Sequence, residues 1–293
     1  MSFTRTNSGV SNSHLFYDAE IIIYTEGGSK SFSVDEVENN KYNTKSIDIK
    51  FWKNVFESNG YNKKVQFRAI GSKTSSRTIC NKIITGQVKN IAVVKDRDLD
   101  QFVDVLADSP YILYTKGYSW ENDVFTKELT TSQIESMIFE PILSEEIISI
   151  IESSYEDFRS YGKHLIRLEI LFRKNGIKFL SDFNGERFFN RKHFPTINRE
   201  QVKEVLASKK EDIGRPVRGG LNTGNICPLF SNYGKLIEAL SLAIISYICK
   251  KYSNHSSIPK LMIQTAMIER FAQKISKDKD DYYFSIVQRL KVA

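Results

Sequence analysis

The first part of the chain alternates short apolar runs with longer segments in which apolar residues recur at helical spacing. The short runs are β-branched or aromatic and are bounded by polar residues or glycine, which is typical of buried strands. These runs cover residues 20–25, 65–69, 91–94 and 111–114. Strands that alternate with helices predict an α/β fold in which right-handed crossovers connect the strands of a parallel sheet.

Two helices are predicted between the first three strands. The segment DIKFWKNVFESNG places its apolar residues on one helical face and ends at Gly60. The segment TSSRTICNKIITG repeats isoleucine at helical spacing and ends at Gly86. Glycine is a common helix terminator, so both boundaries are well marked. Residues 27–47 are polar and lack a clear period, and a connection of this length is usually functional or disordered.

Beyond about residue 130 the helical pattern dominates. The most apolar stretch, LIEALSLAIISYIC, is too short to cross a bilayer and contains Glu238, so we interpret it as a core helix. A few strands are expected around HLIRLEILFR. We therefore divide the chain into a flexible N-terminus (1–18), a parallel-sheet domain (19–130) and a mainly helical, basic domain (131–293) that serves substrate binding, partner docking or dimerisation.

The net charge of +7 is concentrated in one stretch. Residues 159–218 contain fifteen Lys and Arg against seven Asp and Glu. Such a stretch is either a solvated surface or a site for a polyanion. The three cysteines form no CxxC pair, which argues against a zinc site, and the absence of an apolar leader predicts a cytoplasmic protein.

Carboxylates follow two of the predicted strands. Glu26 and a double glycine follow the first strand, and Asp96, Asp98 and Asp100 follow the third. Ligand sites gather beyond the carboxyl ends of parallel strands, and carboxylate oxygens suit Mg²⁺, with Mn²⁺ as an alternative. Alternate residues of an extended segment point the same way, so Asp96 and Asp98 can face one ion. In the competing interpretation, Asp98 or Asp100 merely caps the next helix.

The segments YTEGGSK, DIKFW, AIGSKTS, IAVVKDRDLD and YSWEND together resemble the TOPRIM-like effector nucleases of bacterial anti-phage systems, in particular the AriB-type effectors of the PARIS system. Glu26 matches the family's glutamate after the first strand, and Asp96 and Asp98 match its DxD motif. The resemblance covers about residues 20 to 125, and the helical remainder matches loosely through YGKLIEAL. It implies a TOPRIM-like, Rossmann-like domain.

Two further family positions have matches here. Asp48 precedes an aromatic pair, as in the family, but about twenty residues separate it from Glu26 instead of a few, so it is alternatively a helix cap. Glu121 ends a Tyr-x-x-Glu sequence. It is expected to be either a supporting or second-metal carboxylate that takes part in catalysis, or a surface residue beside Trp120.

The resemblance also implies a function. It predicts a metal-dependent endonuclease, the toxic effector of abortive infection, that cleaves host tRNA, lysine tRNA in particular. An ABC-type ATPase of the AriA kind would hold it inactive until a phage anti-restriction protein triggers its release, and the freed form would be a homodimer. Glu26, Asp96 and Asp98 would bind the metal, with Asp100 as a further ligand.

Several cations are candidates for contacting phosphate. Lys95, Arg97 or Lys73 would stabilise phosphate charge, and the sequence does not choose among the three. The segment FNGERFFNRKHF interleaves phenylalanines with a second set of cations, namely Arg187, Arg191, Lys192 and His193. Rings and cations in alternation are typical of single-stranded RNA binding. The competing interpretation is a hairpin that packs its phenylalanines into the core.

Two other function classes fit the residues. The same carboxylates would serve a metal-dependent DNA nuclease, and a non-enzymatic docking module of a defence complex would need no metal at all. A nucleotide-driven ATPase or kinase is disfavoured, because the sequence has no G-x-x-x-x-G-K-[ST] motif.

Overall fold

The chain folds into two compact units in a computed structural model that describes residues 18–103, 106–138, 142–189, 193–213, 226–253 and 258–293. The first unit contains the chain up to Asp96, residues 107–116 and residues 268–293. The second contains residues 97–106 and 117–267. This division differs from the predicted boundary near residue 130, because the last helical segment belongs to the first unit.

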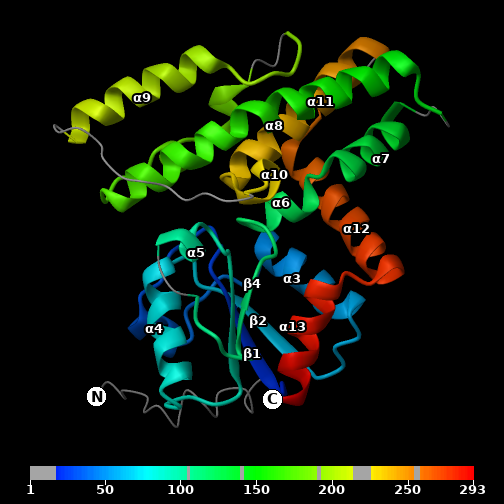
Figure 1. Ribbon diagram of the computed structural model, residues 1–293. Coiled ribbons are helices and arrows are strands. Elements are labelled where there is room, and N and C mark those ends of the chain that lie inside the picture. Colours follow the sequence, from blue (N-terminus) through cyan, green and yellow to red (C-terminus); the bar gives the residue numbers. More distant parts are fainter. Residues whose placement is uncertain (1–17, 104–105, 139–141, 190–192, 214–225, 254–257) are drawn as a thin grey trace. The chain divides into compact units, whose positions relative to one another are not determined.

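The first unit is built on a four-stranded parallel sheet with the order β2-β1-β3-β4 (Figure 1). Its strands are β1 (Ile21–Thr25), β2 (Val65–Ala69), β3 (Ile91–Lys95) and β4 (Ile112–Tyr114). All four coincide with the predicted strands to within two residues, and the predicted α/β fold class is confirmed. Thr25 pairs with Ala69 on one side and Val94 on the other, so the carboxyl ends of β1 and β3 are adjacent.

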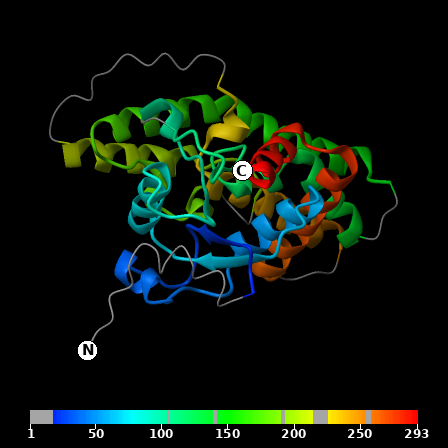
Figure 2. The ribbon, with the colours of Figure 1, turned by 90° about the horizontal axis from the view of Figure 1, so that it is seen from below.

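Helices cover both faces of this sheet, as Figures 1 and 2 show. Ile22 and Tyr24 of β1 point toward α2 (Val34–Glu38) and α4 (Lys73–Ile84), with which they share an apolar cluster. The opposite face carries α3 (Ile47–Ser58) and α13 (Asp281–Val292). There Phe51 stacks on Phe271, and Tyr283 packs against both rings. The chain's last helix therefore completes the core of the first unit.

The ends of α3 and α4 follow the predicted signals. Gly60 and Gly86, with φ of +69° and +67°, come directly after their C-cap residues. The polar stretch 27–47 is ordered and contains α2, which the sequence pattern did not reveal. A capping box between Ser33 and Glu36 begins that helix, so its start depends on side-chain hydrogen bonds more than on apolar periodicity.

The second unit is helical and surrounds α11 (Gly234–Tyr252), which contacts several other elements of that unit. Its other helices are α5 (Asp100–Val103), α6 (Trp120–Val124), α7 (Lys127–Ile138), α8 (Glu145–Lys174), α9 (Arg199–Ile213) and α10 (Pro228–Ser231), with 3-10 turns η2 (Leu180–Asp182) and η3 (Gly185–Phe188). Helix α12 (Lys260–Asp278) begins in the second unit and ends in the first. The predicted core helix is confirmed as part of α11, whose Ile244, Ile245 and Ile248 are fully buried.

The strands expected around HLIRLEILFR are absent, and this segment is the C-terminal half of α8. Its buried residues include Leu165, Ile166 and Ile170, which recur at helical spacing and face one side. A short run rich in branched residues resembles a strand, but the period extends unbroken from Ile147 onward. Among the described helices, none is both long enough and apolar enough to cross a membrane.

Candidate functional site at the edge of the sheet

Glu26 and Lys95 meet where β1 and β3 end. The strand register places Glu26, one residue beyond Thr25, next to Lys95. The Glu26 Oε1 and Lys95 Nζ atoms are 3.5 Å apart, and the two side chains are only 8% and 15% exposed. The predicted catalytic glutamate thus has an internal cationic neighbour, and Asp96 follows Lys95 directly at the same sheet edge.

The first turn of α3 brings Asp48 to this edge. A Cβ built on Gly27 would overlap the Asp48 carboxylate, so the carboxylate lies directly against the β1 end. The N-cap of α3 is Ser46, whose side chain accepts a hydrogen bond from the Ile49 amide. The alternative in which Asp48 caps its helix is therefore wrong. Asp48 and Gly27 are thus in contact, although about twenty residues separate them in the chain.

The second glycine of the pair accommodates Asn43. Gly28 has a φ of +145°, and a Cβ there would overlap the Asn43 amide group. That amide donates to the carbonyls of Lys30 at 2.8 Å and Ala69 at 3.0 Å, and its oxygen accepts from the Lys30 amide at 3.2 Å. Asn43 thus fastens the start of the polar stretch to the end of β2. The double glycine is explained by close approach of the chain's own side chains.

Asp96 and Asp98 of the DxD motif belong to different units. Asp98 is 9% exposed, has a φ of +50°, and donates its backbone N–H to the Tyr118 carbonyl at 2.7 Å. Asp100 is the first residue of α5. Within the described residues, no three His, Cys, Asp or Glu side chains form a group suited to a metal ion.

Arg173 of α8 is the centre of a hydrogen-bond network near Asp98 in the second unit. The sequence did not predict this role. Arg173 donates to Glu169 Oε1 at 2.9 Å and to the Tyr118 hydroxyl at 2.6 Å. Burial acts to lower the pKa of Arg173, but Tyr118, Glu169 and Asp98 outweigh burial and hold the pKa above its ordinary value. The signal was available in part, since Glu169 and Arg173 are four residues apart on one helix.

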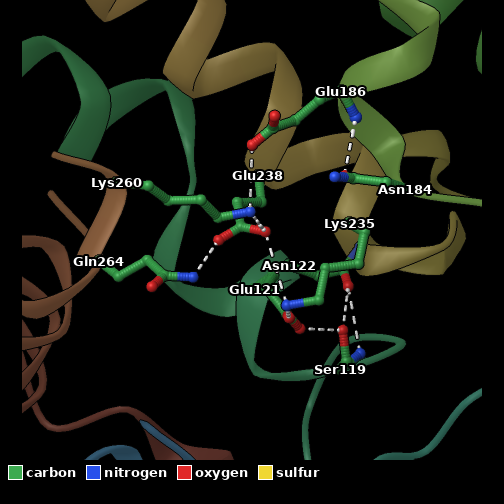
Figure 3. A network of polar contacts seen from close by, with 9 residues as sticks. All are labelled: Ser119, Glu121, Asn122, Asn184, Glu186, Lys235, Glu238, Lys260 and Gln264. Atoms are coloured by element: carbon green, nitrogen blue, oxygen red, sulfur yellow. Dashed lines mark hydrogen bonds and ion pairs between the residues drawn. The ribbon is translucent and has the colours of Figure 1, made fainter. Parts of the chain in front are cut away.

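Glu121 lies in a buried network of the second unit, drawn in Figure 3. Its Oε1 atom is 2.5 Å from Lys235 Nζ, and its Oε2 atom accepts a hydrogen bond from Ser119 at 2.5 Å. Lys235 also lies 3.5 Å from Glu238, a carboxylate that is 1% exposed. The alternative in which Glu121 is a surface residue beside Trp120 is wrong, because Glu121 is buried. Its partner Lys235 lies 5.6 Å from the Trp120 ring.

The same network continues to α12 and η3. Lys260 lies 2.9 Å from Glu238 and 3.3 Å from Glu186, and Gln264 donates a hydrogen bond to Glu238. Each buried carboxylate is therefore matched by a lysine from another turn or element. A Cβ built on Gly234 would overlap the Ser119 hydroxyl, so this glycine of YGKLIEAL allows α11 to start against the network.

The remaining predicted cations lie on different segments of the chain. Lys73 is the first residue of α4, and Arg97 directly follows Asp96 in the chain. Arg187 lies 5.0 Å over the Phe183 ring, and His193 is exposed. Arg191 and Lys192 lie outside the described residues.

Two of the four phenylalanines of FNGERFFNRKHF belong to the core of the second unit, whereas Phe194 is 38% exposed. Phe188 and Phe189 are 0% and 6% exposed, and Phe189 stacks on Phe158. Base stacking on these two rings is therefore ruled out, as the packing interpretation required. They are held by the η3 turn and by a β-bridge between Phe189 and Ile197.

Comparison with known proteins adds no relative. A scan against protein-family models finds no match to the chain, and a search of curated proteins finds none either. The resemblance to TOPRIM-like effectors therefore stays a prediction from the motif residues.

Proposed function

We propose that the chain is a metal-dependent endonuclease whose catalytic edge is formed where β1 and β3 end. One observation carries this proposal: Glu26 and Asp96 directly follow neighbouring parallel strands. The carboxyl edge of a parallel sheet is where such folds place their ligands. Asp48 adds a third acidic side chain against Gly27 at the same edge.

The donor chemistry suits Mg²⁺ or Mn²⁺. These cations favour carboxylate oxygens and keep several waters, so one or two protein carboxylates with substrate phosphate suffice. Glu26 and Asp96 of the first unit would hold the ion. The motif resemblance alone adds Asp98 and Asp100, which belong to the second unit. When bound, the ion supplies a Lewis acid for the scissile phosphate and lowers the pKa of a bound water.

The chain's own residues prepare this edge. The Glu26 side chain is only 8% exposed, so a charge there is costly without a partner. The Lys95 ammonium offsets this cost. Asn43 and the two glycines fix the backbone beside it. Lys95 ends β3 and Lys73 begins α4, and either cation could contact the substrate phosphate. Arg97, which follows Asp96 in the chain, is the third candidate. Glu121 has both oxygens engaged, and we assign it a structural role.

The substrate and biological setting follow from the resemblance alone. We propose host tRNA as the substrate, with lysine tRNA favoured, in a cytoplasmic abortive-infection response. An ABC-type ATPase would restrain the protein, a phage anti-restriction protein would trigger its release, and the free form would act as a homodimer. A DNA nuclease with the same carboxylates is the second candidate, and a non-enzymatic docking module is the third.

The deciding experiment incubates the purified protein with total tRNA and, separately, with plasmid DNA. Each reaction is run with Mg²⁺, with Mn²⁺ and with chelator, beside Glu26→Ala. Discrete tRNA fragments that require metal and disappear in Glu26→Ala support the proposal. Cleavage of plasmid alone would keep the metal site and replace the substrate.

Glu57→Ala is the matched control, because Glu57 is an exposed glutamate of α3 in the same unit. It should cleave like the unsubstituted protein. If neither polymer is cut while both variants fold normally, the trial is repeated after addition of the co-expressed ATPase and its trigger. Absence of cleavage there as well would leave the docking module as the better explanation.

A further inference from the structure

Helix α8 has a strongly divided charge pattern. Its N-terminal half contains only acidic charged residues: Glu145, Glu146, Glu152, Glu156 and Asp157. From residue 159 onward it contains five cations: Arg159, Lys163, Arg167, Arg173 and Lys174. The single acid in that half is Glu169, which is buried and paired with Arg173. The exposed charge of this half is therefore entirely positive.

Four of these cations lie on one side of the helix. At 100° per residue, the positions of Arg159, Lys163, Arg167 and Lys174 fall within about 80° of one another, and they extend over ~22 Å. All four side chains are exposed. We call this set the α8 basic stripe. Arg173 points elsewhere, toward Tyr118 and Glu169.

Ordinary helix electrostatics do not account for the stripe. The macrodipole favours cations only in the last turn of a helix, which explains Lys174 but not the three cations about two to four turns earlier. Arg159 lies 3.6 Å from Glu156, a weak contact on an exposed surface. Lys163 and Lys174 form no ion pair with a described residue. Their charge is therefore available to a partner.

His164 borders the stripe, because its position lies about 60° round the helix from that of Arg167, and Tyr161 lies about 60° further on. The Tyr161 and His164 rings of α8 lie 5.7 Å apart, and Arg199 of α9 lies 5.1 Å over Tyr161. Arg199 is fixed by an ion pair of 2.8 Å with Asp157. Figure 1 shows α9 beside α8 in this unit. Cations in a row with aromatic faces beside them are the combination that binds unpaired nucleotides.

We propose that the α8 basic stripe binds the sugar-phosphate backbone of RNA, with His164 beside an unpaired base. The choice of RNA rests on the proposed function, and the row of cations accounts for backbone binding. The stripe uses different residues from segment 183–194, for which RNA binding was one of two interpretations of the sequence, because Phe188 and Phe189 of that segment are buried.

The test measures binding without cleavage. Fluorescence anisotropy with a labelled RNA hairpin, in chelator and over a series of KCl concentrations, gives the affinity and its salt slope. The variant Lys163→Gln/Arg167→Gln/Lys174→Gln should bind at least tenfold more weakly. Its slope should be smaller by about 2 to 3, because each lost phosphate contact removes ~0.7 to 0.9 from it. Circular dichroism checks folding, and Lys163→Gln/Lys174→Gln replaces the triple variant if that fails to fold.

The matched control is Lys53→Gln/Lys250→Gln/Lys277→Gln, which removes the same charge from exposed lysines on three other helices. Its salt slope should change by less than about 1. Equal losses in both variants would mean that only net charge matters and would overturn the proposal. Unchanged RNA binding by the stripe variant, with lost binding to anionic phosphatidylserine vesicles, would assign the stripe to a membrane instead.

This result is independent of catalysis. Glu26→Ala should bind RNA with an unchanged salt slope, whether or not the unsubstituted protein cleaves tRNA. Stripe-dependent binding without any metal-dependent cleavage would reject the nuclease and keep the RNA surface. If the stripe variant still cleaves tRNA and binds RNA with unchanged affinity, the nuclease is kept and the RNA surface on α8 is rejected. His164→Leu should weaken binding to the hairpin loop more than to a fully paired duplex.

Discussion

The two units use buried carboxylates in opposite ways. In the first unit, Glu26 lies at a sheet edge with Lys95 beside it and Asp96 next in the chain. In the second, Glu121 and Glu238 are enclosed by Lys235, Lys260 and hydrogen-bond donors from several elements. Burying a charge is costly unless partners replace water. The partners of Glu121 and Glu238 therefore stabilise the second unit, whereas Glu26 at the sheet edge has the carboxylate neighbours on which the proposed function rests.

The contrast teaches how to choose a site residue. Glu121 looked like a catalytic candidate because of its motif, but its contacts occupy both oxygens. Asp48 looked like a helix cap, but its carboxylate lies against Gly27 at the sheet edge. The sequence motif alone does not separate the two cases, whereas the surroundings of each carboxylate do.

The largest expected effect is on the stability of the second unit. Lys235→Met removes a cation that serves both Glu121 and Glu238, and these carboxylates are 3% and 1% exposed. Because Lys235 is itself 37% exposed, we expect a loss of about 2–3 kcal/mol in unfolding free energy, near the low end for a broken buried pair. Urea unfolding measures it, with Lys250→Met on the same helix as control. Equal stability of the two variants would contradict the structural assignment.

The next largest expected effect is on metal binding at Glu26 in the first unit. Lys95→Met removes the ammonium that faces Glu26, so a metal ion no longer competes with it. We expect Mn²⁺ to bind about tenfold more tightly, which corresponds to ~1.4 kcal/mol. Isothermal titration measures the affinity without reference to activity, and Lys53→Met is the control. Weaker Mn²⁺ binding would show instead that Lys95 holds Glu26 in its ligand position.

A smaller effect tests the uncharged part of the second unit. The buried Tyr155 hydroxyl lies 2.7 Å from the Ser241 hydroxyl and 2.9 Å from that of Thr130. Burial raises the pKa of Tyr155 to about 12. Tyr155→Phe should cost about 1 kcal/mol, which is typical of one lost hydrogen-bonding group, because the Ser241 hydroxyl still donates to the Phe125 carbonyl at 3.3 Å. Denaturant unfolding tests this value against Tyr247→Phe, and a cost equal to that of Lys235→Met would refute the ranking.

The smallest effect should be shared by both units. Burial raises the pKa of Cys80 in the first unit and of Cys249 in the second from 9.0 to about 11. A raised acid pKa in the folded state contributes stability that is complete below pH 9 and is lost as pH rises through about 11. The urea midpoint should therefore fall slightly over this window.

A thiol reagent gives the companion readout. At pH 8, Cys227 should react fast because it is exposed, whereas Cys80 and Cys249 should react only after unfolding. One fast thiol per native chain is the expected count. Rapid reaction of all three would mean that the apolar surroundings of the two buried thiols open readily.

The sequence alone determined the parts of the fold that depend on local periodicity. The four strands, α3, α4 and the core helix α11 were predictable because apolar spacing and terminating glycines act over a few residues. The placement of Glu26 and Asp96 at one edge was also predictable, since parallel strands align their carboxyl ends. The C-terminal half of α8 was misjudged because a short branched run resembles a strand when its longer period is not followed.

Tertiary structure alone decided which side chains meet. Asp48 reaches Gly27, Arg173 reaches Tyr118, and Glu121 reaches Lys235 across separations of 21, 55 and 114 residues in the chain. Likewise α13 completes the core of the first unit only because the chain returns to it at its end. No local pattern specifies such contacts, because they arise when distant apolar faces are buried together and carry their polar neighbours with them.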